Sequence, residues 1–258
     1  SRGLGDVYKR QIYNDLNKDV IKLLDFFKNN SFETIDNQIS KIIADYSLSD
    51  SEAYGYEYYG CNSSDGLGKY NKAAFQKLRK DFNDSNRDNL AMLFALILYG
   101  FNNQIRFNNK GEYNLPVGKR DYNRSTKYNL ASFCRDLASQ DSIILNTDFR
   151  NFDISTLNGD DMIYCDPPYL ITTAAYNEQD GWNTNDEKDL LDFLTRVNKQ
   201  GIKFALSNVL EHKGQRNELL DNWAKQYKVH NLNFSYNNSN YHSTASSHKT
   251  QEVLITNY

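Results

Sequence analysis

Hydrophobic and polar positions follow two different rhythms along the 258-residue chain. In the first part, apolar residues recur at the three- and four-residue spacing of helices. This pattern predicts helices over about 16–30, 34–47, 71–83, 87–101 and 124–139, the fourth of them apolar nearly all round and therefore buried. The intervening stretches 48–70 and 103–123 are polar and contain Gly, which predicts loops, the second with a β-hairpin or ordered loop.

From about residue 140 the rhythm changes to short apolar runs separated by helical segments. The runs 142–147, 162–165 and 202–207 suit strands buried on both faces, and 12–15 reads as the end of an earlier strand. A helix over 185–201, closed by Gly201, and strands at about 227–234 and 252–258 complete the pattern. The alternation predicts an α/β fold with a mostly parallel sheet, into which the helical and loop region 48–135 is inserted.

Composition and charge change this picture little. A formal charge of −3 gives no global signal for nucleic acid, and no apolar run is long enough to span a membrane. Three scattered cysteines indicate reduced thiols and a cytoplasmic setting, and the histidine spacing does not favour a metal site. Residues 1–11 carry three basic residues without periodicity, and we interpret them as an artefactual leader.

Three acidic residues stand where the apolar strand runs end: Asp15, Asp148 and Asp166. Ligands of open α/β sheets bind outside the carboxyl ends of the strands. An N-cap for Asp15 and a turn position for Asp148 are the plain structural alternatives. Asp166 is harder to explain in that way. It precedes two of the chain's three prolines and Tyr169, so that D-P-P-Y forms a rigid turn that aims an acid and an aromatic ring.

These residues resemble a known family. D-P-P-Y after a hydrophobic strand is similar to the signature of the Dam-like DNA adenine-N6 methyltransferases, the D12 class. The segments YNDLNKDVI, NKAAFQKLRKDFN, NQIRFNNKGEYNLPVGKRDYN, NTDFRNF and SSHKTQEVLITNY resemble further parts of that family. The resemblance covers nearly the whole chain from residue 12. It implies a Rossmann-like methyltransferase sheet with an antiparallel final strand.

The resemblance also implies roles for the residues. Asp166 and the Pro167 carbonyl would accept the two N–H bonds of a flipped adenine, with Pro168 fixing the turn and Tyr169 stacking on the base. Asp15 would bind the ribose of S-adenosylmethionine, Asp148 and Phe149 would meet its adenine, and Asp166 would border both ligands. Methyl transfer is then a direct displacement, aided by positioning and electrostatics, without a metal or a covalent intermediate.

A local basic patch is consistent with a double-stranded DNA partner. Residues 106–127 carry six basic residues against two acids, and 69–80 carry five basic residues and no acid. A solvated surface is the alternative. The residues expected to contact DNA are Arg106, Asn108, Lys110, Tyr113, Asn114, Pro116, Lys119, Arg120 and Arg124.

The chain departs from the family at its start, where we find no F-x-G-x-G turn and no strand before it. We therefore expect a truncated, inactive fragment that lacks a central strand and binds S-adenosylmethionine poorly. In domain terms, we expect a catalytic domain over 12–47 and 136–258 and a target-recognition region over 48–135.

The resemblance further implies a bacterial or phage-encoded monomer that recognises a short palindrome such as GATC, with a restriction endonuclease as a partner at the system level. Two alternatives stay open from the residues. One is an enzyme that methylates adenine in RNA or a protein amide, and the other is a DNA-binding module without catalysis.

Overall fold

The computed structural model describes residues 10–172, 181–232 and 250–258, so residues 1–9 of the expected leader and 246–249 of the tail motif lie outside it. The chain divides into two compact units, residues 1–147 (unit 1) and 148–258 (unit 2). Each unit has its own hydrophobic core. None of the described helices is long and apolar enough to cross a bilayer.

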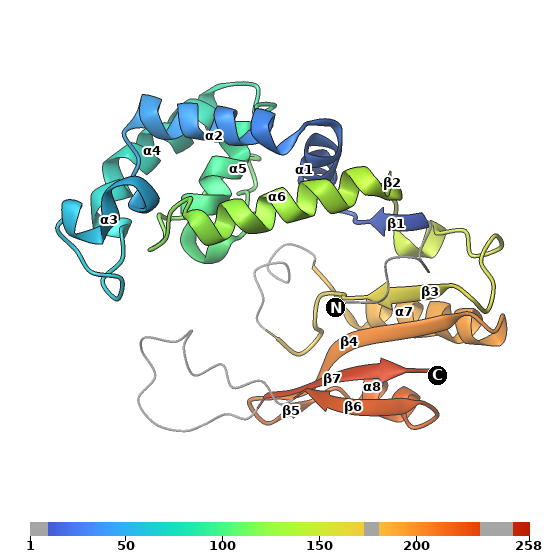
Figure 1. Cartoon of the computed structure of the whole chain (residues 1–258). Coiled ribbons are helices and arrows are strands. Elements are labelled where there is room, and N and C mark those ends of the chain that lie inside the picture. The colour runs from blue at the N-terminus through green and yellow to red at the C-terminus, as the bar shows by residue number, and fades with distance from the viewer. Residues whose placement is uncertain (1–9, 173–180, 233–249) are drawn as a thin grey trace. The chain divides into compact units, whose positions relative to one another are not determined.

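Unit 1 is mostly helical and carries one small parallel sheet (Figure 1). Its strands are β1 (Arg10–Asn14) and β2 (Asp141–Leu145), paired in parallel with Ile12 opposite Ile143. Its helices are α1 (Lys18–Asn29), α2 (Phe32–Tyr46), α3 (Ser51–Tyr58), α4 (Gly68–Asp84), α5 (Leu90–Tyr99), the 3₁₀ turn η1 (Phe101–Asn103) and α6 (Arg124–Ser139).

Side-chain caps explain where these helices begin. Asn17, Ser31 and Asn123 stand at the N-caps of α1, α2 and α6, and each side-chain oxygen accepts from a backbone N–H in the first turn. The prediction of helix 124–139 is confirmed at both ends. The N-cap of α1 is Asn17 rather than Asp15, whose carboxylate instead accepts from the Asn17 backbone N–H at 2.7 Å.

The core of unit 1 gathers around α5, which the sequence predicts to be buried. From Leu93 to Tyr99 only Phe94 of α5 is not fully buried, and α5 packs against α1, α2 and α4. The Tyr99 hydroxyl donates to the Ser49 carbonyl at 2.6 Å. Burial of this size contributes about 1.5–3 kcal/mol for each large apolar side chain.

One expectation for unit 1 is wrong in detail. Residues 48–70 are not all loop, because α3 forms there, interrupted by Gly55 with a φ of +73°. Strand β1 begins at Arg10 and so includes the last two residues of the expected leader, whose interpretation as an artefact stays a prediction.

Unit 2 is a mixed sheet with helices beside it. Its strands are β3 (Met162–Cys165), β4 (Lys203–His212), β5 (Gln215–Arg216), β6 (Lys228–Leu232) and β7 (Thr250–Thr256). Its helices are the 3₁₀ turn η2 (Phe149–Asn151), α7 (Thr184–Lys199) and α8 (Glu218–Ala224). The sequence pattern predicts neither α8 nor β5.

The sheet order is β3-β4-β7-β6, with the short β5 beside β4. Strands β3 and β4 are parallel, whereas β7 is antiparallel to both of its neighbours, β4 and β6. The expected antiparallel final strand is therefore confirmed. The missing central strand stays a prediction; among the described residues, β1 pairs only with β2 and β3 only with β4.

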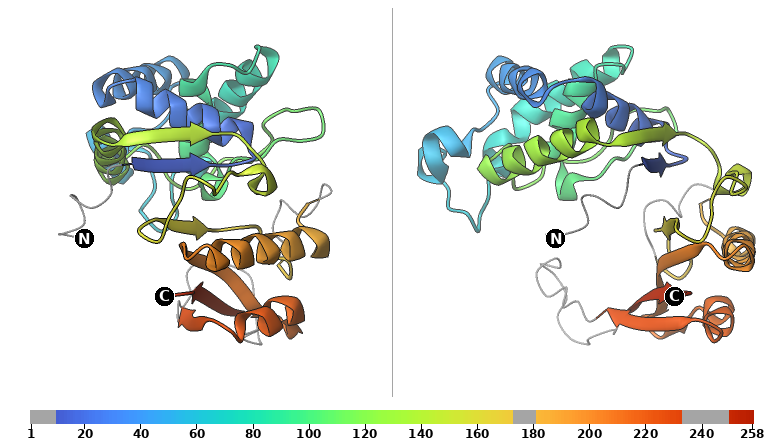
Figure 2. Two further views of the ribbon diagram at one scale, coloured as in Figure 1. Left: turned by 90° about the vertical axis from the view of Figure 1, so that its right-hand side faces the viewer. Right: turned by 45° about the vertical axis from the view of Figure 1, so that its right-hand side comes forward.

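The two α-helices of unit 2, α7 and α8, cover the same face of its sheet (Figure 2). Phe204 and Leu206 of β4 point to that face and are fully buried with Leu194 of α7 and Leu220 of α8. Side chains alternate along a strand, so Ala205 and Ser207 point to the opposite face. No described helix of unit 2 covers that second face, on which the candidate site lies.

Candidate active site and DNA-contacting surface

The D-P-P-Y turn begins directly where β3 ends. The Asp166 carboxylate is exposed, and one of its oxygens, Oδ1, accepts two hydrogen bonds. The Ser207 hydroxyl donates to it at 2.7 Å and the Tyr169 hydroxyl at 3.2 Å. No described residue donates to the other oxygen, Oδ2. One half of the carboxylate is thus fixed by the protein, and the other half can accept hydrogen bonds from a ligand.

Strand register brings Ser207 to this turn. Cys165 lies opposite Leu206 in the parallel pair of β3 and β4, so Asp166 and Ser207 follow side by side. The Tyr164 hydroxyl in turn donates to the Ser207 oxygen at 3.2 Å. The polar group therefore stands where β3 ends, the usual position of ligand sites in open α/β sheets.

The rest of the turn is held from within. The Tyr169 carbonyl accepts from the backbone N–H and the hydroxyl of Thr172, at 3.1 and 3.0 Å. Burial and the nearby Asp166 charge raise the pKa of Tyr169 to about 12, so its hydroxyl keeps the proton that it donates. Burial, with Asp166, also raises the pKa of the Cys165 thiol to about 12, which makes this cysteine a poor nucleophile near neutral pH.

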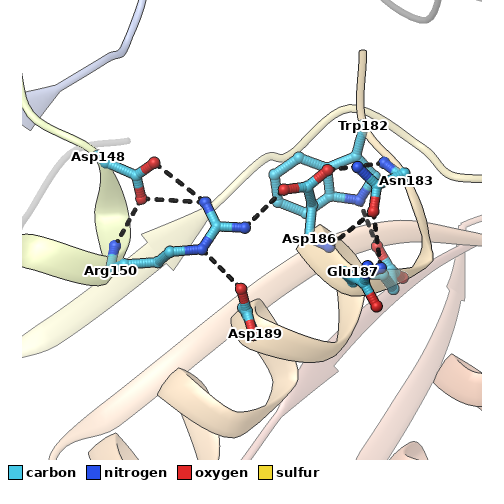
Figure 3. Close-up of polar contacts among 8 residues, drawn as sticks. Asp148, Arg150, Trp182, Asn183, Asp186, Glu187 and Asp189 are labelled. Atoms are coloured by element: carbon cyan, nitrogen blue, oxygen red, sulfur yellow. Dashed lines mark hydrogen bonds and ion pairs between the residues drawn. The ribbon is translucent and has the colours of Figure 1, made fainter. Parts of the chain in front are cut away.

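Asp148 lies in a second polar group of unit 2 (Figure 3). The Asp148 carboxylate accepts from the Arg150 backbone N–H at 2.9 Å and from its guanidinium at 3.0 Å, which confirms the turn position. Arg150 also contacts Asp186 and Asp189 of α7 at 2.5 and 2.7 Å. These hydrogen bonds and charges, the one from Asp189 foremost, raise the Arg150 pKa further above its already high value.

The Phe149 ring packs against Trp182 and Phe193, with centroids 5.9 and 6.0 Å away. The Arg150 guanidinium lies 4.7 Å from the centre of the same ring. The structure therefore places the expected cofactor residues Asp148 and Phe149 at a rigid corner between η2 and α7.

Glu187 is a fully buried acid next to this corner (Figure 3). Its two oxygens accept from the Trp182 indole at 2.7 Å and from the Asn217 and Asn208 side-chain amides at 2.9 and 3.2 Å. Burial raises the pKa of the Glu187 carboxyl, and the three hydrogen bonds oppose that rise. Because Asn208 is the neighbour of Ser207, the network anchors β4 at the level of the candidate site.

Asp15 belongs to unit 1 and follows β1 directly. Its Oδ1 atom accepts from Asn17, whereas no described residue donates to Oδ2. The Asn146 amide donates to the Asp15 carbonyl at 2.8 Å, so the ends of β1 and β2 are tied together. The carboxylate is exposed and can accept hydroxyl hydrogen bonds.

The expected DNA-contacting residues form a compact loop between α5 and α6. Phe107 and Tyr113 form an isolated antiparallel bridge, as a hairpin would. The Arg106 guanidinium donates to the Asn114 side chain at 2.9 Å, and Asn108 accepts from the backbone N–H groups of Lys110 and Glu112. Pro116 is exposed, and its carbonyl accepts from Phe101 at 2.9 Å.

Tyr113 does not face solvent, in contrast to the expectation that it contacts DNA. Its side chain is 1% exposed, and its hydroxyl donates to the carbonyls of Leu96 and Gln104. Burial raises its pKa. Because the ring fills the core beneath the hairpin, its role in this conformation is to support the loop.

The basic residues divide into paired and open ones. On α4, Lys77 and Lys80 form exposed ion pairs with Asp81 and Asp84, and Arg79 donates to the Leu115 carbonyl, so three of the five basic residues of 69–80 have a partner within unit 1. In contrast, the side chains of Lys110, Arg120 and Arg124 are exposed on or next to the loop and form no ion pair with a described residue. Asp121, one of the two acids of this region, is buried and accepts from Ser49 and Ser51.

The pattern of the sequence does not single out Ser207, Tyr164, Arg150 or Glu187. Ser207 and Tyr164 have a weak signal, since both belong to apolar strand runs next to a chemical motif. The roles of Arg150 and Glu187 become visible only in the structure, through contacts with Asp189, 39 positions from Arg150, and with Asn217 and Trp182, 30 and 5 positions from Glu187.

Comparisons with known proteins show the family to which the chain belongs. The family model described as D12 class N6 adenine-specific DNA methyltransferase matches residues 4–238. The chain is 38% identical over 253 residues to the type II methyltransferase M.FokI of Planomicrobium okeanokoites, covering 96% of this chain and 36% of that protein. It is 36% identical over 264 residues to the modification methylase StsI of Streptococcus sanguinis, covering 99% and 37%.

A third relative, a DNA adenine methylase of Vibrio cholerae, is 31% identical over 146 residues, covering 53% of this chain and 51% of that protein. The chain thus spans little more than a third of the length of the first two relatives. The family model covers most of the chain, including the strand that carries the D-P-P-Y turn. This chain belongs to the D12 class of N6 adenine-specific DNA methyltransferases.

Proposed function

We propose that the protein containing this chain transfers a methyl group from S-adenosylmethionine to the N6 atom of an adenine that is flipped out of double-stranded DNA. The observation that carries this proposal is the Asp166 carboxylate at the end of β3. Its Oδ1 atom accepts two hydrogen bonds from the protein, whereas its Oδ2 atom accepts none from a described residue. Family membership and relatives named as type II and modification methylases support the same activity.

The chemistry asks for hydrogen-bond acceptors rather than a strong base. The exocyclic amine of adenine is a weak nucleophile because its lone pair is delocalised into the ring. Asp166 Oδ2 would accept one N–H and the Pro167 carbonyl the other, which localises the lone pair on nitrogen. The N–C bond would then form as the bond from the methyl carbon to sulfur breaks, which leaves a neutral thioether, and the surplus N6 proton would pass to the Asp166 carboxylate and from there to water.

Tyr169 would stack on the flipped base while its hydroxyl holds Asp166. A base inside a duplex cannot reach the turn, so the proposal includes base flipping. The protonated thiol of Cys165 does not compete as a nucleophile, which is consistent with direct transfer.

S-adenosylmethionine supplies the electrophilic methyl group when bound. The residues present fit it in part: the open Oδ2 of Asp15 suits ribose hydroxyls, and the Phe149 corner offers an aromatic surface for an adenine ring. Asp148 would lie near that adenine, but its carboxylate already accepts a hydrogen bond from the Arg150 guanidinium. No residue of the chain is assigned to a metal ion in this reaction.

The open basic residues around Arg120 and Arg124 would contact DNA phosphates, and Asn108 and Asn114 can offer amide groups to bases. A cytoplasmic, monomeric enzyme working beside a restriction endonuclease is the setting that we propose. The names of the relatives, a type II methyltransferase and a modification methylase, support only the link to a restriction–modification system.

The test compares Asp166→Ala and Asp166→Asn with the wild type in the full-length protein that contains these residues. We expect labelled-methyl transfer to duplex DNA to fall by at least about 100-fold in both variants, because an oriented acceptor is lost. DNA affinity should stay within about threefold of the wild type. Asp160→Asn, an exposed acid of unit 2 outside the site, is the control and should keep full activity.

Activity that survives in Asp166→Ala would contradict the role of this residue. A wild-type protein that binds duplex DNA but transfers no methyl group to it would favour the alternative of a non-catalytic DNA-binding module. Transfer to RNA or protein in place of DNA would favour the other alternative.

A further inference from the structure

Four side chains of unit 2 form one hydrogen-bonded chain beside the turn. Tyr164 donates to Ser207, Ser207 donates to Asp166, and Tyr169 donates to the same Asp166 oxygen. Tyr164 and Ser207 share the sheet face that the described helices of unit 2 leave uncovered. Neither residue belongs to the D-P-P-Y motif.

We propose that Ser207, with Tyr164 behind it, is the positioning residue that turns the Asp166 carboxylate so that Oδ2 faces the adenine amine. This inference rests on the proposed function and deepens it. Ser207 does not touch the reacting atoms; it acts through Asp166.

The direction of each hydrogen bond follows from the chemistry of the groups. An ionised carboxylate only accepts, so the single Ser207 proton must go to Asp166. The Ser207 oxygen can then accept, and the Tyr164 hydroxyl supplies that proton. Each hydroxyl therefore has one available acceptor in this series of hydrogen bonds. The donors run in one direction, from Tyr164 to Ser207 and from Ser207 to Asp166 Oδ1.

Two donors on one oxygen restrict the rotation of the carboxylate. Asp166 is exposed and follows the end of the strand, so its side chain has little packing to fix it. Ser207 is 8% exposed and lies within β4, which pairs with β3 on one side and with β7 on the other. This strand is a rigid point of attachment for the hydrogen bond to Asp166. The Tyr169 hydroxyl alone would hold Oδ1 from within the turn itself, at the longer distance of 3.2 Å.

The test uses Ser207→Ala, Ser207→Thr and Tyr164→Phe in the full-length protein. For Ser207→Ala we expect kcat for methyl transfer to fall about 10- to 100-fold, since a misplaced acceptor costs rate. KM for DNA and for S-adenosylmethionine should change less than about threefold. Ser207→Thr keeps the hydroxyl and should recover most of the rate, whereas Tyr164→Phe should lose less than Ser207→Ala.

Two matched controls separate positioning from folding. Ser155→Ala removes another serine hydroxyl next to an aspartate, Asp153, whose carboxylate accepts from the Ser155 backbone N–H in an exposed loop of unit 2. Tyr258→Phe removes a hydroxyl that donates to Met162 of β3. Both should keep the wild-type kcat, and the urea concentration at the midpoint of unfolding, followed by tryptophan fluorescence, should be the same in Ser207→Ala and Ser207→Thr.

Three outcomes would overturn the inference: an unchanged kcat in Ser207→Ala, a loss in Ser207→Thr as large as in Ser207→Ala, or a loss that appears only in KM. A fully active Asp166→Ala would instead contradict the proposed function. The two failures are therefore distinguishable.

Discussion

At the residue scale, Glu187 shows how a buried charge is tolerated in unit 2. Three donors from three different segments surround its carboxylate, yet burial still raises its pKa. A buried carboxylate whose two oxygens both accept hydrogen bonds from the protein stabilises one arrangement of those segments. The two asparagine side chains that it orders lie on β4 and at the start of α8.

We expect Glu187→Gln to lower the free energy of unfolding by about 1–3 kcal/mol, because the new amide group faces the Trp182 indole donor and leaves it unpaired. The folded-state pKa of Glu187 lies above its unfolded value, so its contribution is fully present below the unfolded pKa and is lost as pH rises through the folded pKa. The difference in stability between wild type and Glu187→Gln should thus be larger at about pH 5 than at about pH 8. Urea unfolding followed by tryptophan fluorescence measures it, and a difference that grows with pH would contradict it.

Single residues also show which parts of the candidate site could be predicted from the sequence. Asp166 could be predicted because a polar residue before two prolines after an apolar strand is conspicuous along the chain. Its partner Ser207 could not, because the two residues are 41 positions apart and only the parallel register of β3 and β4 brings them together. Tyr113 was predicted to contact DNA but is buried, because an aromatic ring in a polar loop gives no local sign of its burial.

At the element scale, helix ends were predictable where capping residues mark them, and not elsewhere. Asn123 at the start of α6 is such a mark. Helix α3 escaped prediction because Gly55 and a run of tyrosines break its pattern, and it is held by tertiary contacts such as the Ser51–Asp121 hydrogen bonds. The strand β4 is longer than its apolar run because β7 and β5 pair with its polar end.

The loop between α5 and α6 depends on a close approach of two backbones. The Gly118 backbone N–H donates to the Tyr99 carbonyl at 2.7 Å, and a Cβ atom on Gly118 would lie 2.5 Å from the Gly100 carbonyl oxygen. We expect Gly118→Ala to destabilise unit 1 by about 1–3 kcal/mol, as overpacking does. Urea unfolding followed by far-UV circular dichroism measures this change.

Gly159→Ala is the matched control, because a Cβ atom there would meet its nearest atom at 3.3 Å. That substitution should cost less than about 1 kcal/mol. Equal effects of the two substitutions would show that the close approach at Gly118 is unimportant.

The same loop carries the open cations that we assign to DNA. We expect Arg120→Ala and Arg124→Ala each to weaken binding to any duplex sequence and to reduce the slope of log affinity against log salt by about 1. Lys41→Ala changes the net charge equally but removes a lysine paired with Asp45 on α2, and it should leave the slope unchanged. Equal slopes in all three variants would argue against a phosphate contact by either arginine.

At the scale of the whole molecule, the two units have separate cores and separate optical reporters. Both tryptophans, Trp182 and Trp223, lie in unit 2, whereas most of the described helical residues lie in unit 1. Leu78 and Leu194 are each fully buried, one in the core of each unit.

Leu78→Ala should therefore shift the unfolding transition seen by circular dichroism, while Leu194→Ala should shift the one seen by tryptophan fluorescence. Each cavity costs about 2–5 kcal/mol. The measurement is urea unfolding of both variants with both probes. If each substitution moves both transitions equally, the units unfold as one cooperative body, and the separate cores do not define separate folding units.

The division of the chain was less predictable than its elements. The sequence pattern suggests one sheet interrupted by a helical region over 48–135, and that interpretation stays a prediction. In the structure, the boundary between the compact units falls between residues 147 and 148 of the chain, because α1, α2 and α6 share a core with α4 and α5. Which helices share a core depends on their apolar faces, and the pattern along the chain does not say which faces meet.

The position of β7 in the sheet has a consequence for synthesis on the ribosome. β7 lies between β4 and β6, yet it is the last of these strands to be translated. Until it emerges, β6 has no described strand partner, and β4 has an open edge along most of its length. A nascent chain therefore carries exposed strand edges for as long as translation takes to reach residue 256. Such edges invite pairing with neighbouring chains, so a slow or stalled ribosome should favour aggregation of unit 2.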